Sequence, residues 1–331
     1  MQGGCFIGAI GKVPQYAEFV RIRPPGDLAS SFETWLASGF EGAHMRYGDT
    51  WRTKFAEGAP YAFVWTHRSQ PDTALCGILA PSRDAVGRSY PVTVFAAVPL
   101  SFLGDTPHVI PLAFGDFLDR AYQTASPSLY QEGGHLTAPS YQEGGHLAAP
   151  LEQALQWLQA PGYETVASAA IEYAAWCDGT APEQAWLPLF ENGASGAQHA
   201  LAMLALALEP FQGVERPATK LGVRLSLGAG GAAAAVVWLD VIRRMARWRA
   251  TVPVTFWSIQ SGSLVVHFGD VPPSTLPELW LPDPDNESLV PVDGIHAAGI
   301  PSRLSQRMEN LLHQGHGRFA DVLHALESWG S

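Results

Sequence analysis

Residues 75–98 read LCGILAPSRDAVGRSYPVTVFAAV, and this stretch decides most of the fold. Two apolar runs within it, Leu75–Ala80 and Tyr90–Val98, are rich in strand-favouring residues and are bounded by Pro and Gly. The polar loop between them, Pro81–Ser89, carries Arg83, Asp84 and Arg88. The stretch therefore predicts two strands joined by a loop that presents charged side chains.

Elements before this stretch are predicted from local signals. A short apolar strand, Cys5–Ile10, runs into a Gly-Lys-Val-Pro loop at residues 11–14. A helix follows, in which Ser30 has the capping-box spacing to Glu33, and we expect it to end at Gly48. A further strand and a later helix are expected at Tyr61–Thr66 and Ala113–Gln123.

A local duplication follows at residues 130–150. YQEGGHLTAPS is succeeded at once by YQEGGHLAAP, and the Gly-Gly pair and the Pro in each copy argue against a regular helix or strand. We interpret the duplication as an exposed linker. A metal site at His135 and His146 is the alternative, and the flexible glycines make it entropically costly.

The second half is predicted to begin with helices and to continue with strands. Helices are expected at Leu151–Gln159, Ala167–Trp176, Ser195–Glu209 and Ala232–Arg249, a strand at Gly222–Leu227, and a hairpin of Val254–Ser258 with Leu264–Phe268. Residues 272–301 are Pro-rich and irregular, and an amphipathic helix over 304–329 is interrupted near Gly315 and Gly317. The arginines near the end of the fourth helix, from Arg243 to Arg249, are interpreted as a solvated basic terminus that the helix dipole favours.

The length of 331 residues allows about two domains at roughly 150 residues each. Four segments are expected: an N-terminal α/β domain, a flexible linker that holds the duplication, a C-terminal α/β portion, and a Pro-rich segment with a tail helix. Their boundaries are residues 1–125, 126–150, 151–276 and 277–331.

Composition and charge exclude several classes of protein. Apolar residues make up 47% of the chain and charged residues 15%, which rules out intrinsic disorder for the chain as a whole. A formal charge of -11 disfavours nucleic acid and anionic membrane surfaces as partners. No signal peptide or membrane-spanning run is expected, and the widely spaced Cys5, Cys76 and Cys177 favour the cytoplasm.

The chain lacks the sequence templates of common catalytic and cofactor sites. It has no G-x-S-x-G elbow, and the glycine loop at residues 226–231 lacks both the phosphate-loop ending and the dinucleotide pattern. His313, His316 and His324 lack the adjacent Glu of a metalloprotease and are interpreted as surface residues. We therefore expect no catalytic residue, no metal and no cofactor.

Polar residues gather instead around the N-terminal loops. The candidate partner-binding residues are Lys12, Glu18, Arg21, Arg83, Asp84 and Arg88. They lie on loops next to strand ends, where a rigid scaffold commonly presents binding groups. The alternative is structural, with salt bridges such as Arg83 or Arg88 to Glu18 that fix the loops.

These residues belong to a pattern that resembles a known family. The pattern joins GKVP at residues 11–14, EFVR at 18–21 and, above all, GILAPSRDAVGRSYPVT at 77–93. It is similar to TagF, also called ImpM, the accessory proteins of bacterial type VI secretion systems. The match covers about residues 5–100 and, more loosely, parts of the C-terminal half.

The resemblance implies a three-layer α/β/α sandwich with a mainly antiparallel or mixed sheet, followed here by a helical tail. It also implies a cytoplasmic, non-enzymatic protein that represses secretion after translation by binding a forkhead-associated scaffold protein or another component of the apparatus.

Two other functions stay open at this point. The first is a hydrolase-like enzyme that uses acidic and arginine residues near the Pro81–Ser89 loop, with Asp84, Glu18 or Asp240 as carboxylates. The second is a homo-oligomer assembled through the tail helix and Ser195–Glu209. No nucleic acid and no membrane insertion are expected.

Overall fold

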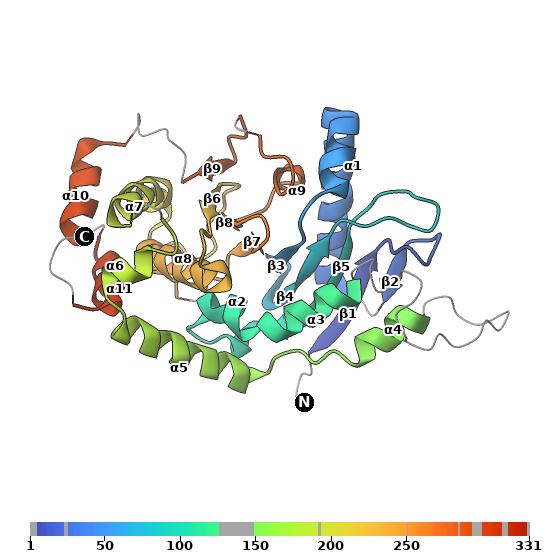
Figure 1. The fold of residues 1–331 in the computed structure, drawn as a ribbon, viewed down its shortest axis with the longest axis horizontal. Coiled ribbons are helices and arrows are strands. Elements are labelled where there is room, and N and C mark those ends of the chain that lie inside the picture. Colours follow the sequence, from blue (N-terminus) through green and yellow to red (C-terminus); the bar gives the residue numbers. More distant parts are fainter. Residues whose placement is uncertain are drawn as a thin grey trace. The chain divides into compact units, whose positions relative to one another are not determined.

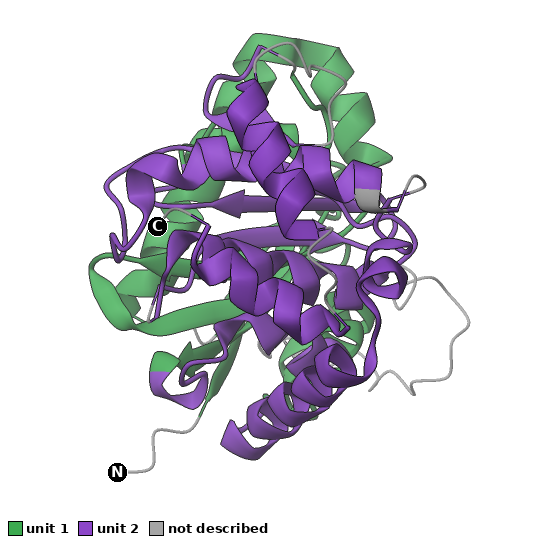
Figure 2. Ribbon diagram, turned by 90° about the vertical axis from the view of Figure 1, so that its left-hand side faces the viewer, with its two compact units in different colours: residues 1–100, 116–160, 272–283 green, residues 101–115, 161–271, 284–331 purple. Residues whose placement is uncertain are grey.

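The chain divides into two units, each assembled from three separate stretches of sequence (Figure 2). The structure, a computed structural model, describes residues 5–22, 26–125, 149–190, 193–249, 251–283, 285–292, 300–312 and 317–329. Unit 1 comprises residues 1–100, 116–160 and 272–283, and unit 2 comprises residues 101–115, 161–271 and 284–331. The division into four segments that the sequence suggested is not tested by these two units and stays a prediction. The duplication at 130–150, with His135 and His146, lies outside the described residues apart from its last two positions.

Unit 1 contains a fully antiparallel set of five strands in the order β2-β1-β5-β4-β3 (Figure 1). The strands are β1 Phe6–Gly11, β2 Val20–Ile22, β3 Tyr61–His67, β4 Gln70–Ala80 and β5 Val92–Pro99. Seven successive residues of β4 and of β5 are buried without alternation, which indicates that both faces of these strands are covered. The two strands predicted on either side of the 81–91 loop are therefore confirmed as a β4–β5 hairpin.

Helix α1, Gly26–Ala56, covers one face of these strands and is longer than predicted. Gly48 adopts φ 53° and ψ -126°, which interrupts the helical backbone where the sequence predicted its end. The helix resumes because Trp51 and Phe55, one turn apart, are both buried in the core of unit 1. The predicted helix end at Gly48 is therefore confirmed as a break in the helical backbone, and the helical segment that follows it, up to Ala56, was not predicted.

Three further helices belong to unit 1. They are α3 Gly115–Ala125, α4 Ala149–Gln156 and the single turn α9 Thr275–Glu278. Figure 1 shows α3 on the face of the strands opposite α1. Unit 1 is thus a three-layer α/β/α arrangement, as the sequence predicted.

Unit 2 contains four strands in the order β7-β8-β6-β9. They are β6 Gly222–Ser226, β7 Val254–Ser258, β8 Ser263–His267 and β9 Leu289–Pro291. The β7–β8 hairpin is confirmed, and β9, inside the predicted irregular segment, pairs parallel with β6. The other strand pairs within each unit are antiparallel, so the fold class of the chain is α/β with a mostly antiparallel, mixed sheet.

Helices surround these four strands. The α-helices are α2 Ile110–Ala113, α5 Tyr163–Gly179, α6 Pro182–Trp186, α7 Ala194–Leu208, α8 Gly231–Ala246, α10 Ser302–Leu312 and α11 Phe319–Glu327. The 3-10 turns are η1 Leu100–Phe102, η2 Pro107–Val109 and η4 Glu209–Phe211. The predicted tail helix consists of α10 packed on α7 and α11 packed on α8. Within the described ranges, no helix combines the length and the apolar character needed to cross a membrane.

Candidate functional site

Three strand ends meet at one edge of unit 1. The last residue of β1, Gly11, and the last residue of β4, Ala80, both pair with Val92 at the start of β5. Lys12 and the loop of residues 81–91 therefore follow these strand ends at neighbouring positions. The Lys12 amide donates a hydrogen bond to the Pro91 carbonyl at 3.4 Å. This register explains why residues about 70 positions apart in sequence share one site.

The loop of residues 81–91, here called the site loop, is a tight and ordered turn. Arg83 and Ser89 form a β-bridge, and the Gly87 amide donates to the Asp84 carbonyl at 2.9 Å. Gly87 has φ +86°, a backbone conformation that strongly favours glycine. The site loop thus needs Gly87 and a hydrogen-bonding side chain at its first turn residue.

Asp84 supplies that side chain and holds the site loop from within. Its Oδ1 atom accepts hydrogen bonds from the backbone amides of Val86 at 3.1 Å and Arg88 at 2.8 Å. Its Oδ2 atom accepts from Lys12 Nζ at 2.9 Å and from Arg88 Nε at 2.6 Å. Each carboxylate oxygen accepts about two such bonds, so the four donors saturate the group.

The charge of Asp84 is stabilised by these donors although its side chain is fully buried. Burial opposes ionisation and raises the pKa, but the hydrogen bonds from Lys12 and Arg88 outweigh it and hold the pKa of Asp84 well below its ordinary value. Arg88 also donates to the Ala17 carbonyl at 2.5 Å, which ties the site loop to the segment after β1. Asp84 is therefore a charged anchor that joins two loops.

The other predicted site residues lie around this anchor in different roles. Arg21, on β2, forms a two-pronged ion pair with Glu33 of α1 instead of contacting Asp84. Glu18 and Arg83 are exposed, and neither forms an ion pair within the described part of the chain. The structural alternative, salt bridges that fix the loops, is confirmed by the pairs that Lys12 and Arg88 form with Asp84. The pairs given as examples, Arg83 or Arg88 with Glu18, do not form within the described residues.

Aromatic contacts, which we did not predict for the site, hold the loop from its other end. Tyr90 lies 5.5 Å from Phe19, edge to face, and 5.1 Å from Phe40 of α1, measured between ring centroids. Phe19 and Tyr90 both stand inside the quoted family motifs, which is the signal that pointed to them. The tip of the site loop is left exposed, with Val86 66% accessible to solvent.

A second charged cluster, in unit 2, was not predicted as one. The buried carboxylate of Asp240 on α8 accepts hydrogen bonds from Arg243 at 2.8 Å, Arg244 at 3.0 Å and the Tyr173 hydroxyl at 3.3 Å. Arg244 also reaches Glu327 of α11 at 2.5 Å. The prediction that these arginines form a solvated terminus was wrong for Arg243 and Arg244, because they turn inward to Asp240.

Reactive residue types meet in this cluster, since His108 and Cys177 both lie against Tyr173. Burial lowers the pKa of His108 to about 4, and burial raises the pKa of the Cys177 thiol to about 11. A catalytic cysteine needs the opposite shifts, because its thiolate is the nucleophile and its histidine takes up a proton. The Asp240 cluster is therefore built as a structural network, and no group of three or more metal ligands is found within the described ranges.

The part of the chain that contains the site loop matches a known protein-family model. Residues 8–133 match the model described as TagF N-terminal domain, Type VI secretion system-associated. This range holds most of β1, all of β2 to β5, the site loop and all six candidate residues, so unit 1 is built around a secretion-associated domain. Residues 8–133 are therefore similar to the TagF N-terminal domain, as the motif at residues 77–93 predicted.

One solved structure is similar at low identity. The crystal structure of PA0076 from Pseudomonas aeruginosa PAO1 is 22% identical with a TM-score of 0.38, and the match covers 47% of this chain. It covers 64% of PA0076, so the chain spans less than two thirds of that protein. No curated protein matches the chain.

Proposed function

We propose that the chain is a cytoplasmic accessory protein of a bacterial type VI secretion system that represses the apparatus after translation by binding one of its components. The observation that carries this proposal is the site loop, which a saturated, buried Asp84 holds in one conformation while its tip stays exposed. A loop held in this way presents a surface without paying ordering entropy on binding.

The binding surface we propose consists of Glu18, Arg83, Val86 and Arg88. All four are exposed, and Arg83 and Glu18 have charges that no ion pair within the described residues uses. An arginine beside an exposed apolar residue is typical of interface hot spots. Lys12 and Asp84 support this surface from beneath, and Arg21 fixes the neighbouring strand through Glu33.

The partner we propose is the forkhead-associated scaffold protein of the apparatus, as the family resemblance implies. The matched TagF N-terminal domain supports a type VI secretion partner, because that domain is described as secretion-associated. Self-association of the chain remains a separate prediction. Static light scattering of the full chain checks it, and a monomer mass contradicts it.

The hydrolase alternative receives less support from the geometry. Asp84 is buried and paired, but four donors occupy its two oxygens and its pKa is lowered. A general acid or base at neutral pH needs a pKa near the working pH and an accessible lone pair or proton. We therefore propose a binding role without a catalytic residue, metal or cofactor.

The test is co-purification of the tagged chain with the forkhead-associated subunit. A double variant, Arg83→Glu with Val86→Asp, reverses the charge and removes the apolar tip without touching a described intrachain ion pair. We expect it to weaken binding at least about tenfold, as loss of a hot spot does.

The matched control is Lys54→Glu, which reverses another exposed cation of unit 1, on α1, that is not part of the proposed surface. It should bind like the unchanged chain. If the unchanged chain captures no apparatus component, or if the double variant binds as well as the control, the proposal fails.

A further inference from the structure

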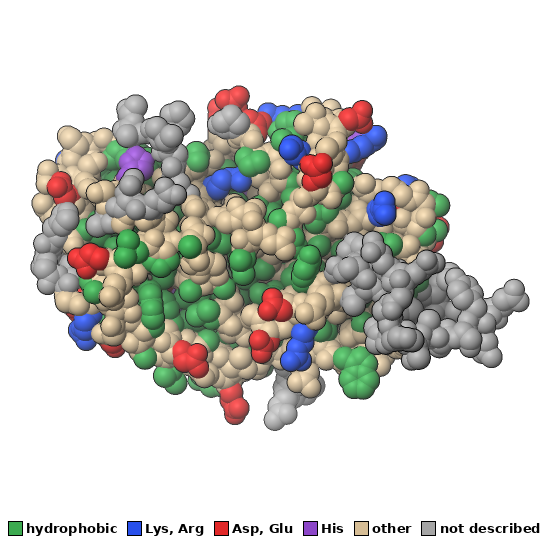
Figure 3. Space-filling model, viewed as in Figure 1, with side chains coloured by type: hydrophobic (Ala, Val, Ile, Leu, Met, Phe, Trp, Pro, Cys, Tyr) green, Lys and Arg blue, Asp and Glu red, His purple; other side chains and the backbone are tan. Residues whose placement is uncertain are grey.

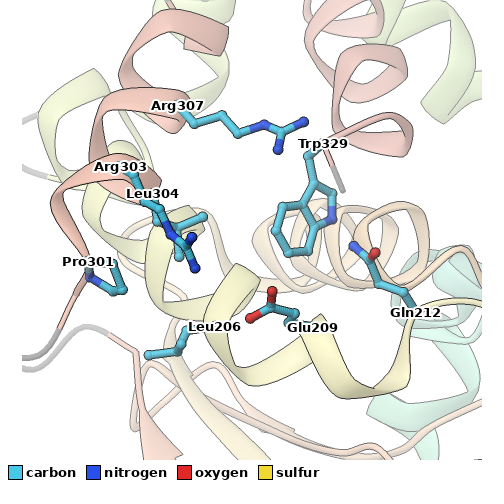
Figure 4. A pocket seen from close by; sticks show the side chains of 8 residues that line it. All are labelled: Leu206, Glu209, Gln212, Pro301, Arg303, Leu304, Arg307 and Trp329. Carbon is cyan, nitrogen blue, oxygen red and sulfur yellow. The ribbon is translucent and has the colours of Figure 1, made fainter. Parts of the chain in front are cut away.

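Unit 2 contains a hollow that the proposed function does not use. It measures about 400 Å³, is open to solvent, and is lined by residues of α7, the η4 turn and α10 and by Trp329 (Figure 4). Small-molecule sites typically measure about 300–1,000 Å³, so the hollow has room for a small ligand. Leu206 and Leu304 supply apolar walls, and the indole of Trp329 supplies an aromatic one.

Charged side chains enter the hollow from two sides. Arg303 and Arg307 lie one turn apart on α10, while Glu209 approaches from the η4 turn (Figure 4). Arg303 and Glu209 form no ion pair with any described residue. Because Arg303 and Glu209 face the same hollow without forming an ion pair, a ligand can contact both side chains.

Two of the side chains that line the hollow, Gln212 and Trp329, are held by the end of α8. Helix α8 stops at Ala246, and Arg247 adopts the left-handed conformation with φ 56°. The carbonyl of Met245 in the last turn accepts hydrogen bonds from Trp329 Nε1 at 2.9 Å and from Gln212 Nε2 at 3.3 Å. Carbonyls in the last turn have no hydrogen-bond partner inside their own helix. The Trp329 and Gln212 side chains supply that partner and are held in place by it.

We propose that this hollow binds a carboxylate attached to an apolar residue, either a free amino acid or the C-terminal residue of a peptide. The guanidinium fork of Arg303 can pair with the carboxylate of such a ligand, whereas the neighbouring Glu209 repels a phosphate group with its charge of about -2. The Glu209 carboxylate then accepts a hydrogen bond from the ammonium or amide N–H of the bound residue. The apolar side chain of the ligand lies against Trp329, Leu206 and Leu304.

The expected selectivity follows from the planar fork of arginine. Guanidinium groups bind carboxylates through two parallel hydrogen bonds, and a neutral amide loses the charge assistance of that pair. Phenylalanine and N-acetylphenylalanine should therefore bind, whereas N-acetylphenylalanine amide should bind at least about tenfold more weakly.

Isothermal titration of the full chain with these three probes tests the assignment, with inorganic phosphate as a fourth. Arg303→Gln should weaken both carboxylate probes about tenfold and leave the amide unchanged. Glu209→Gln distinguishes a free amino acid from a peptide C-terminus as the natural ligand. If the ligand is a free amino acid, this variant should weaken binding of phenylalanine more than binding of the acetylated probe. Tighter binding of the acetylated probe identifies a peptide terminus.

Arg249→Gln is the matched control, since Arg249 is another exposed arginine of unit 2 that does not line the hollow. Circular dichroism of each variant shows whether the fold is retained. The assignment is overturned if no probe binds at millimolar concentration, if the amide binds as well as the acid, if phosphate binds more tightly than both carboxylates, or if Arg303→Gln acts no differently from Arg249→Gln.

Discussion

Asp84 is the residue on which the site loop depends. Its neutral isostere keeps the shape of the side chain but removes the charge that Lys12 and Arg88 stabilise. An amide also presents two N–H donors toward groups that are themselves donors. The loop would then lose its anchor while both cations stay in place.

Asp84→Asn is therefore expected to loosen the site loop and to lower the thermal unfolding midpoint at pH 7. Hydrogen exchange should show faster exchange at the Val86 and Arg88 amides, which donate to this carboxylate. The control is Asp72→Asn, an exposed acid of the same unit on β4. Unchanged protection of the two amides would mean that the charge does not hold the loop.

Buried histidines predict how stability depends on pH. Burial lowers the pKa of His108 and of His267 to about 4 in the folded state, below the ordinary value of about 6.5. Between these values the unfolded chain binds more protons, so stability falls as the pH is lowered from about 6.5 to about 4. Each histidine contributes a slope of up to about 1.4 kcal/mol per pH unit in that window.

Urea unfolding at pH 7, 6 and 5 checks this prediction. His108→Asn should flatten the slope, although Asp240, Arg243, Arg244 and Tyr173 surround the ring and the variant starts from lower stability. His324→Asn, at an exposed histidine of α11, should leave the slope unchanged. A pH-independent free energy of unfolding in this window contradicts the burial of neutral histidines.

At the level of single residues the sequence predicted the candidates better than their partners. The motif at residues 77–93 located Asp84, Arg83 and Arg88 because residue types in fixed order are readable without a structure. The pairing of Asp84 with Lys12 depends on the β1–β5 register, which strand propensity does not encode. The burial of Asp240 was missed because arginines three and four positions later read equally well as a solvated helix end.

Among the elements, the segment 272–283 packs into the core of unit 1 from far along the sequence. Trp280 packs edge to face on Phe55 at 5.1 Å between centroids, and its Nε1 atom donates to the Ala59 carbonyl at 2.7 Å. The Tyr61 hydroxyl donates to the Leu279 carbonyl at 2.6 Å. A segment more than 200 residues away in sequence therefore completes the core beside α1 and β3.

Trp280→Ala is expected to destabilise unit 1 by about 3–5 kcal/mol, the usual cost of truncating a buried tryptophan. Trp157→Ala is the control, because Trp157 is in the same unit but is 82% exposed, and its loss should change stability by less than about 0.5 kcal/mol. Thermal unfolding followed by circular dichroism measures both. Equal effects of the two changes would contradict the assigned core.

Element type was predictable where periodicity or strand propensity was strong, as in the β4–β5 and β7–β8 hairpins. The helical segment after Gly48 was missed because it depends on tertiary burial, which a local signal does not reveal. Gly48 reads as a helix stop, yet buried Trp51 and Phe55 draw the chain back into a helix. Strands β2 and β9 have three residues each, which is too short for a period-two pattern to stand out.

For the whole molecule, a low charged fraction makes the remaining exposed charges informative. Figure 3 shows apolar side chains at the surface, and in unit 2 Tyr163 and Ile171 of α5 are 61% and 71% exposed. On such a surface we propose Glu18, Arg83 and Arg88 as specific contacts. The TagF domain match supports type VI secretion as the setting of the domain that carries them.

The central claim is that this chain represses secretion through the site loop. The most direct measurement is the amount of secreted type VI effector in a strain that lacks the gene and is complemented with the unchanged chain, with Arg83→Glu/Val86→Asp, or with Lys54→Glu. We predict raised secretion in the deletion strain and with the loop variant, and restored repression with the other two. Unchanged or abolished secretion on deletion, or full repression by the loop variant, would contradict the claim.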